Sequence, residues 1–240
     1  MQNRNNLFLI PARKGSKGLP NKNSRLLKGL PLVCYTFEYV LKILESNDEV
    51  CVSTDDQKII ELAKPYEFKV IKRPIEFSQD NSTMDEVINH VLEEYRLLDI
   101  HFKSIVILQP TSPIRDIIDF LNLKKLYNKN IDMVVSVCEA RENPYYLLYE
   151  ENDEGFIFKS KDLEIHRRQD SPKVYRLNGS FFMINSSSLK NNKIKQLKKI
   201  LKYEMPYERS IDIDDHYDWD LVDFFLNKKT GDNNENYFKN

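Results

Sequence analysis

Residues 7–23 read LFLIPARKGSKGLPNKN, and this stretch decides the fold class that the sequence predicts. Its apolar opening, LFLI, has the length of a strand, and Pro11 ends that strand because proline has no N–H for the next ladder bond. The loop that follows is cationic and contains Gly15 and Gly18. Glycine allows close approach of the backbone, so N–H and ammonium groups can converge on one anion. The stretch therefore predicts a first strand followed by a phosphate-binding loop.

A solvated basic loop is the simpler interpretation of the same residues. The loop matches neither the GxxxxGK[ST] pattern of a P-loop nor the GxGxxG dinucleotide fingerprint. Its position nevertheless favours a ligand, because α/β sheets bind ligands just outside the carboxyl ends of their strands. We therefore expect a phosphate-bearing ligand at this loop, held in a way that neither pattern describes.

The composition narrows the class of protein. The chain has 240 residues, which suits one α/β domain with a smaller appended lobe, and its 36 Lys and Arg balance 37 Asp and Glu. A nucleic-acid-binding protein usually has an excess of basic residues, so nucleic acid is not expected as a partner. The sequence has no apolar run of membrane-spanning length, and the N-terminal MQNRNN has no apolar core. We expect a cytoplasmic protein without membrane contact.

Apolar periodicity alternates between strand and helix up to residue 138. After the first strand, strands are expected at 50–53, 68–71, 104–108 and 133–137, and helices at 32–44, 57–63, 117–127 and from about Val87 to Tyr95. This alternation predicts an α/β fold with a doubly wound, mostly parallel sheet. Residues 1–138 and 175–226 are assigned to this domain, and residues 227–240 to a polar tail.

The periodicity changes after residue 138. Residues 143–161, NPYYLLYEENDEGFIFKSK, predict two short strands around a turn at 152–155. An aromatic-rich hairpin that leaves the sheet would expose apolar surface in a monomer, and a second subunit would cover it. A hairpin folded back on its own domain is the alternative. Residues 139–174 are therefore treated as an extension of the domain.

Two later clusters carry charged side chains suited to a carboxylate-bearing ligand and to a metal ion. Arg168 and Arg176 flank a proline-containing segment, and arginine can bind a carboxylate through two parallel hydrogen bonds. Asp212 and Asp214 would point to one face of an extended strand, and paired carboxylates suit Mg2+. An exposed arginine-rich loop and simple helix capping are the alternatives for the two clusters.

Helix capping explains several other polar residues. The pair Asp55–Asp56 precedes the helix at 57–63 and is expected to cap it. Thr83 and Glu86 have the spacing of a capping box. Asp215 and Asp218 are expected to cap the C-terminal helix rather than to bind metal.

Four separated motifs resemble those of the acylneuraminate cytidylyltransferases, the CMP-sialic acid synthetase family, which includes the CMP-legionaminic and CMP-pseudaminic acid synthetases. The first loop reads IPAR, then SKGLP and KN, and the strand at 104–108 ends in QPTSPIR. Arg176 begins RLNG, where the family has RPNG, so Leu177 departs from the pattern. The paired aspartates are the fourth motif. The resemblance covers roughly residues 7–226 in the family's order, and the four motifs together are specific.

The resemblance implies a Rossmann-like nucleotidyltransferase fold whose β-hairpin extension, 139–174, reaches the sugar site and forms a homodimer. It implies transfer of CMP from CTP to the anomeric hydroxyl of a nine-carbon 2-keto sugar acid, such as sialic, legionaminic or pseudaminic acid, with Mg2+ as cofactor and release of pyrophosphate. Two alternatives stay open. One is a nucleotidyltransferase for an eight-carbon sugar acid or a sugar 1-phosphate, and the other is a sugar-nucleotide-binding protein without catalysis.

The resemblance also assigns roles to individual residues. The expected catalytic residues are Arg13, Lys17, Lys22, Asp212 and Asp214, and the two aspartates would bind Mg2+. The expected nucleotide-binding residues are Ala12, Arg13, Ser16, Lys22, Asn23, Arg73, Ser82 and Thr83. The expected sugar-binding residues are Gln109, Arg168, Arg176 and Asn178. No dedicated general base is evident, and either aspartate or a metal-bound hydroxide could serve.

Overall fold

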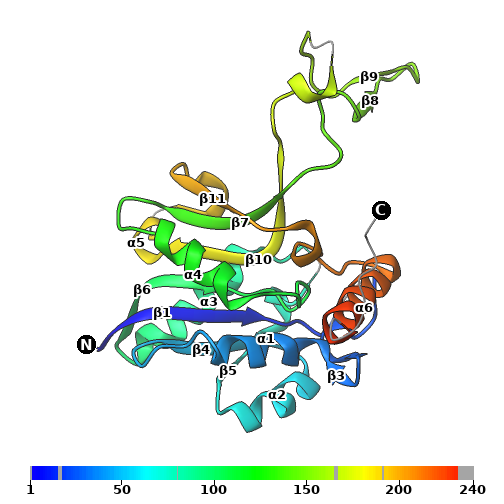
Figure 1. Ribbon diagram of the computed structural model, residues 1–240. Helices are drawn as coiled ribbons and strands as arrows, with labels where there is room; N and C mark the ends of the chain where they lie inside the picture. Colours follow the sequence, from blue (N-terminus) through cyan, green and yellow to red (C-terminus); the bar gives the residue numbers. More distant parts are fainter. Residues whose placement is uncertain (1, 16–17, 80, 165–166, 191, 232–240) are drawn as a thin grey trace.

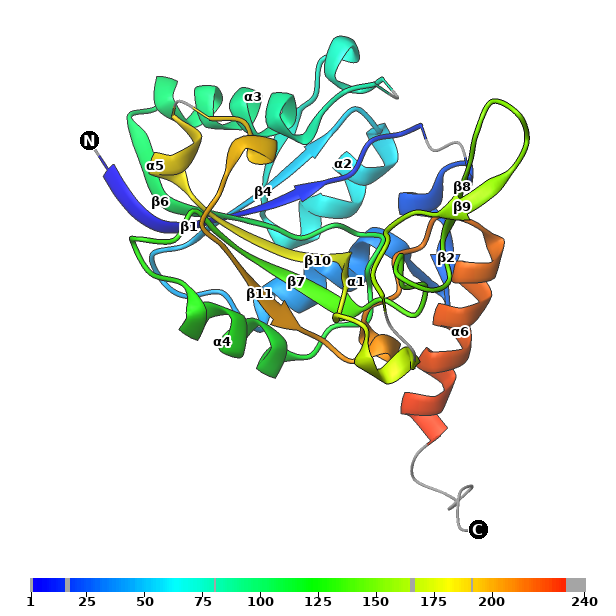
Figure 2. The same ribbon diagram turned by 90° about the horizontal axis from the view of Figure 1, so that it is seen from above.

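A seven-stranded sheet forms the centre of the protein (Figures 1 and 2). The computed structural model describes residues 2–15, 18–79, 81–164, 167–190 and 192–231. The strands are β1 (Gln2–Pro11), β2 (Leu26–Leu27), β3 (Leu30–Pro31), β4 (Glu49–Thr54), β5 (Lys69–Lys72), β6 (Ile100–Ile107), β7 (Met133–Glu139), β8 (Tyr149–Glu151), β9 (Ile157–Lys159), β10 (Tyr175–Asn185) and β11 (Ile200–Glu204). The helices are α1 (Leu32–Leu41), α2 (Gln57–Ala63), α3 (Met84–Leu97), α4 (Ile117–Leu126), α5 (Ser186–Leu189) and α6 (His216–Gly231).

The central sheet has the strand order β11-β7-β10-β6-β1-β4-β5. All of its strands run in the same direction except β10, which pairs antiparallel with both β6 and β7. The predicted α/β fold with a mostly parallel sheet is therefore confirmed. Because β1 lies between β6 and β4, the loop that follows β1 emerges in the interior of the sheet's carboxyl edge.

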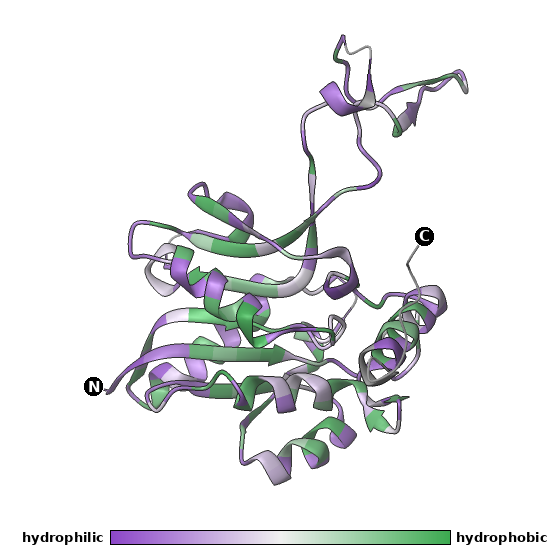
Figure 3. Ribbon diagram, viewed as in Figure 1, coloured by the Kyte–Doolittle hydropathy of each residue, from purple (hydrophilic) through white to green (hydrophobic). Residues whose placement is uncertain are grey.

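The two faces of β1 belong to two separate cores, since side chains alternate along a strand. Phe8 and Ile10 pack in a core with residues of α1, α2 and α4, whereas Leu7 and Leu9 pack with residues of α3. Figure 2 shows α3 and α4 on opposite sides of the sheet. In Figure 3 the middle of β1 is hydrophobic and its first residues are hydrophilic. Burial on both faces explains why residues 7–10 of this strand are continuously apolar.

Helices α2, α3 and α6 begin at predicted caps, whereas the cap of α4, Asp116, was not predicted. Asp56 accepts a hydrogen bond from the N–H of Lys58, Thr83 and Glu86 form a capping box, and Asp215 accepts from the N–H groups of Tyr217 and Asp218. Helix α6 continues to Gly231, into the segment predicted as a polar tail, and the rest of that segment lies outside the described residues. Within the described ranges, no helix combines the length and apolarity needed to cross a bilayer.

The predicted hairpin is present as β8 and β9, which pair antiparallel around a turn at 152–156. Figure 1 shows that it projects away from the central sheet on two connecting segments. Apolar side chains on it face solvent: Phe156 and Ile157 are each 68% exposed and Phe158 is 50% exposed. The extension therefore carries an apolar surface that its own domain leaves uncovered.

A buried ion pair holds the segment before the paired aspartates against α4. Arg209 donates from Nε and Nη2 to the carboxylate of Asp119, with both distances 2.8 Å. Asp119 is fully buried and also accepts hydrogen bonds from the hydroxyl of Tyr203 and the N–H of Asp116. This pair fixes the 3-10 turn Tyr207–Arg209, which directly precedes residues 210–214.

We expect Arg209→Ala to lower the free energy of unfolding by about 3 kcal/mol, because it leaves the buried charge of Asp119 without its cation. Urea denaturation followed by circular dichroism measures this loss. Arg167→Ala is the matched control, since Arg167 binds Asp170 through the same two nitrogens but both side chains are exposed. The control should lose less than about 1 kcal/mol, and equal losses in the two variants would contradict the prediction.

Candidate active site

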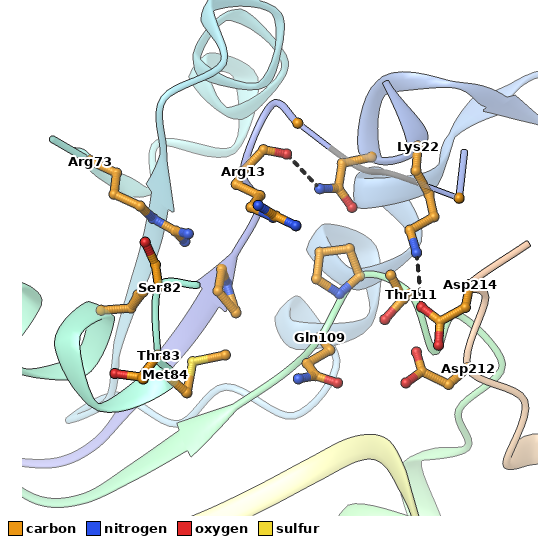
Figure 4. A pocket seen from close by; sticks show the side chains of 16 residues that line it. Arg13, Lys22, Arg73, Ser82, Thr83, Met84, Gln109, Thr111, Asp212 and Asp214 are labelled. Atoms are coloured by element: carbon orange, nitrogen blue, oxygen red, sulfur yellow. Dashed lines mark hydrogen bonds and ion pairs between the residues drawn. The ribbon is translucent and has the colours of Figure 1, made fainter. Parts of the chain in front are cut away.

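A pocket of about 620 Å3 lies at the carboxyl edge of the parallel strands (Figure 4). The predicted site residues that line it are Arg13, Lys22, Asn23, Arg73, Ser82, Thr83, Gln109, Asp212 and Asp214. The other lining residues are Pro11, Gly15, Gly18, Met84, Val87, Pro110 and Thr111. The fold thus brings residues from the two ends of the chain to the edge where α/β sheets bind ligands.

The loop after β1 is held by hydrogen bonds to β4 and to the next turn. The N–H of Ala12 donates to the carbonyl oxygen of Ser53 at 2.9 Å, and the hydroxyl of Thr54 donates to the carbonyl oxygen of Ala12. The amide of Asn23 donates to the carbonyl oxygen of Arg13 at 3.0 Å. Ala12 is fully buried and does not line the pocket, so it acts on this loop through its backbone.

Two guanidinium groups form the cationic side of the pocket. Figure 4 shows Arg13 and Arg73 directed into it from the ends of β1 and β5. Arg73 is buried and donates from Nε and Nη2 to the hydroxyl and carbonyl oxygens of Ser53, at 3.2 and 2.9 Å. Burial lowers the pKa of Arg73 to about 10, and the charge of Arg13 acts in the same direction. An anionic ligand would relieve both effects.

Lys22 connects the cationic loop to the aspartates. It is buried, and its Nζ donates to the carbonyl oxygen of Ile213 and lies 3.3 Å from Oδ1 of Asp214. The two segments approach through their backbones at Gly18, where a methyl group would collide with the carbonyl oxygen of Asp214. Glycine at this position is therefore required for the contact.

The paired aspartates do not lie in a strand, which differs from the extended strand that the sequence predicts. Residues 210–214 join no sheet. Instead, the N–H of Ile213 donates to the carbonyl oxygen of Thr111 at 2.8 Å, which holds this segment beside the loop after β6. Ile213 is buried in an apolar cluster with Trp219, while Asp212 and Asp214 line the pocket. The side chains of residues 212–214 therefore alternate between pocket and core as in a strand, although the segment pairs with no other strand.

The surroundings of the Asp212 carboxylate favour a bound cation. Burial raises its pKa, and the charge of Asp214 raises it further, against the opposing effect of a hydrogen bond with Thr111. A divalent ion would compensate both unfavourable effects, so the donor set fits Mg2+, which takes one or two carboxylates and completes its shell with phosphate and water. Among the described residues, no group of three or more His, Cys, Asp or Glu gathers as a metal-binding cluster.

Gly179 lies directly beneath the polar side chains of the site. Its φ is +70°, and a Cβ built on it would lie 2.5 Å from Oε1 of Gln109 and 2.9 Å from both Oδ2 of Asp212 and Oγ of Ser112. Glycine is needed here both for the backbone conformation and for the space. Gln109 and Asp212 therefore both occupy space that any side chain at residue 179 would need.

We expect Gly179→Ala to lower turnover about tenfold, which corresponds to about 1.4 kcal/mol of lost transition-state stabilisation, because the methyl group displaces Gln109 and Asp212. Steady-state kinetics measures the effect. Gly155→Ala is the control, since Gly155 has φ +84° on the hairpin and its Cβ would meet only Glu151, at 3.7 Å. Both variants incur backbone strain, so a similar change in turnover would show that crowding at Gly179 does not matter.

Two of the predicted sugar-binding residues, Arg176 and Asn178, do not line the pocket. Asn178 is fully buried, where its amide donates to the hydroxyl of Ser210 at 2.9 Å and its carbonyl oxygen accepts from the hydroxyl of Ser136 at 2.6 Å. Arg176 is exposed and donates to the carbonyl oxygen of Ser210 at 3.0 Å. Both residues therefore tie β10 to the segment that leads to the aspartates.

Three further predicted residues fall outside the structural description. Ser16 and Lys17 lie outside the described residues. Arg168 begins a 3-10 turn, Arg168–Asp170, but its side chain is not described. Their assignments stay predictions.

The start of α3 adds pocket residues that sequence analysis missed. Thr83 caps the helix and also lines the pocket, so the capping and the site interpretations are compatible. Met84 and Val87 line the pocket beside it. Their spacing of three residues directly after a predicted cap is the signal that could have identified them, because it places both on one helix face.

Solved structures share this fold. A structure described as CMP:2-keto-3-deoxy-manno-octonic acid synthetase complexed with CTP matches with a TM-score of 0.67 and 16% identity, over 94% of this chain and 99% of that chain. The sheet and the pocket at its carboxyl edge define an α/β protein with the Rossmann-like nucleotidyltransferase fold.

The chain belongs to the cytidylyltransferase family, whose model matches residues 7–213. It is 32% identical to the CMP-N,N'-diacetyllegionaminic acid synthase of Legionella pneumophila, over 90% of this chain and 94% of the relative. It is 33% identical to the N-acylneuraminate cytidylyltransferase of Escherichia coli, over 93% of this chain and 52% of the relative. The chain therefore spans about half the length of the latter protein. The family resemblance inferred from the motifs is confirmed.

Proposed function

We propose that this chain transfers CMP from CTP to the anomeric hydroxyl of a nine-carbon 2-keto sugar acid, a sialic acid or a legionaminic or pseudaminic relative, and releases pyrophosphate. One observation carries the proposal: Arg13, Lys22 and Arg73 share a single pocket with Asp212 and Asp214. A polyphosphate needs the cations, and a divalent ion bound to it needs the carboxylates. The legionaminic acid synthase and the N-acylneuraminate cytidylyltransferase named above support the nine-carbon sugar class.

The nucleotide would lie along the cationic side of the pocket. Arg13 and Lys22, with Lys17 of the same loop, would bind the triphosphate and stabilise the charge that builds on its oxygens as pyrophosphate departs. The base would rest near Arg73 and the start of α3, where Ser82 and Thr83 offer polar groups and Met84 and Val87 offer an apolar surface. The triphosphate is thus assigned to the cationic lining residues and the base to the uncharged ones beside Arg73.

Asp212 and Asp214 would hold Mg2+. When bound, this ion would neutralise phosphate charge and polarise the groups that react. A carboxylate of the pair would also take the proton that the anomeric hydroxyl loses as its oxygen attacks the α-phosphorus and the bond to pyrophosphate breaks. The remaining task of the chain is to position the two substrates in line.

Gln109 would orient the sugar, because its side chain lines the pocket next to Asp212. Arg176, near the start of β10, and Arg168 of the extension would attract the sugar carboxylate. We assign Asn178 to the sugar site through its effect on the backbone, since its side chain holds β10 against Ser210.

Pyrophosphate release with CTP and Mg2+ tests the function. The panel of acceptors comprises N-acetylneuraminic, legionaminic and pseudaminic acids and an eight-carbon 3-deoxy sugar acid. Release with one nine-carbon acid is the expected result. Release with only the eight-carbon acid would overturn the assignment of a nine-carbon sugar. If no acceptor gives release although calorimetry shows CTP binding, the result would favour a binding protein without catalysis.

A homodimer is part of the same proposal, because a second subunit would cover the apolar hairpin. Sedimentation velocity at micromolar concentration should show a dimer. Phe156→Asp with Phe158→Asp should yield monomer, whereas Leu97→Asp, which changes a 74% exposed leucine on α3, should leave the dimer intact. A wild-type chain that sediments only as a monomer would contradict the assignment. We also propose that the reaction takes place in the cytoplasm.

A further inference from the structure

A second cavity lies at the opposite end of the sheet from the candidate active site. It measures about 630 Å3, close to the volume of the first pocket. It is lined by the start of β6, the last turns of α3, the segment after α4, and α5. Figures 1 and 2 show α5 and the start of β1 at one end of the molecule and α6 at the other. Nothing in the proposed reaction uses this cavity.

The rim of the cavity is basic. Its titratable lining residues are Arg96, His101, Lys103, Lys129, Lys190 and Tyr127, and no aspartate or glutamate of the described chain lines it. Neighbouring carboxylates partly compensate two of them: Glu93 binds Arg96 at 2.6 Å, and Asp99 lies 3.6 Å from His101. Lys103 donates to the amide oxygen of Asn5, which carries no charge. The local charge is therefore positive in a chain whose net charge is −1.

The positive charges of Lys129 and Lys190 are the least compensated by neighbouring carboxylates. Both are exposed, and neither makes an ion pair or a side-chain hydrogen bond within the described part of the chain. The amide of Asn185 donates to the carbonyl oxygen of Lys129 at 3.3 Å, and Lys190 lies at the other end of α5, which Asn185 caps. Two unpaired ammonium groups at the rim of one cavity attract an anion between them.

The interior of the cavity is apolar. Phe102 is 8% exposed, and Leu92, Ile100 and Tyr127 are partly buried beside it. Ser186 and Ser187 of α5 also line the cavity and add polar groups to its wall. An apolar interior with a cationic rim suits a ligand that has an apolar body and one anionic end.

We propose that this cavity binds a small amphipathic anion, with an aryl or short acyl body against Phe102 and a phosphate or carboxylate group at Lys129 and Lys190. The hollow shape favours a small molecule over a nucleic acid or a flat membrane surface, which require an extended basic face. The site is separate from the CTP pocket, so both can be occupied at once.

Calorimetric titration with octyl phosphate, below the concentration at which it aggregates and with saturating CTP present, tests the site. We expect octyl phosphate to bind more tightly than inorganic phosphate or the neutral octyl glucoside. Only octyl phosphate has both an anionic group for the basic rim and an apolar chain for the interior of the cavity. Displacement by CTP would overturn the proposal, since it would place the ligand in the first pocket. Binding only to vesicles that contain phosphatidylglycerol, with none to octyl phosphate, would assign the basic rim to membranes instead.

Charge reversal at the rim provides the matched comparison. Lys129→Glu with Lys190→Glu should weaken octyl phosphate at least about tenfold. Lys58→Glu with Lys69→Glu, which reverses two exposed lysines on α2 and β5, should change the affinity less than about twofold. All four positions are exposed, so both double variants should fold. Equal affinities for the two double variants, or equal binding of octyl glucoside and octyl phosphate, would refute the site. Neither outcome depends on pyrophosphate release, so the proposed function is tested separately.

Discussion

Replacement of Asp212 by asparagine is expected to lower turnover by about 10³-fold, the upper range for loss of one transition-state electrostatic contact. The substitution keeps the size of the side chain and removes a half-buried charge that Asp214 and Lys22 both influence. It should also shift the Mg2+ dependence to higher concentrations, because the ion loses one of its two carboxylates. Steady-state kinetics across a Mg2+ titration measures both effects.

Asp220→Asn is the control for Asp212→Asn. Asp220 lies on α6 and is exposed, so its replacement removes the same charge from the same region without touching the pocket. Its kinetics should match those of the wild type. Asp214→Asn should also shift the Mg2+ dependence to higher concentrations, as Asp212→Asn does. An unchanged Mg2+ titration in both pocket variants would remove the two aspartates from the proposed metal site.

Arg13→Ala is expected to lower turnover by about 10² or more, because the guanidinium stabilises charge on the departing phosphate oxygens. Arg13 is the pocket cation that follows β1 directly, and its position is set by the amide of Asn23 on its carbonyl oxygen. Because the effect arises in the transition state, kcat should fall more than the affinity for CTP. Single-turnover kinetics with calorimetric CTP binding separates the two quantities.

Lys14→Ala is the matched control for Arg13→Ala. Lys14 is the adjacent residue, and its backbone N–H donates to the carboxylate of Asp55 at 2.8 Å, a contact that alanine preserves. Its side chain is exposed and does not line the pocket. Loss of one positive charge from the loop should therefore leave turnover close to wild type. If the two variants lose activity equally, the general charge of the loop would account for the effect of Arg13.

The site was predictable where a local pattern determined the position of a residue. Arg13 and Gln109 follow apolar strands directly, and strands of a parallel sheet end at a common edge. Asp212 and Asp214 alternate with buried isoleucines, so the pattern placed them on one face although the predicted strand is absent. The inward side chain of Asn178 was not predictable, because its partner Ser136 lies far away in the sequence.

The sequence by itself determined the alternation of strands and helices, the caps, the hairpin and the motifs of the first loop, since each depends on residues a few positions apart. Only the tertiary structure decided the antiparallel placement of β10, the crowding of Gln109 and Asp212 over Gly179, and the cavity at the far end of the sheet. These features depend on contacts between segments that are distant in the chain. Local side-chain periodicity carries no information about which distant segments meet, because packing of the whole chain selects them.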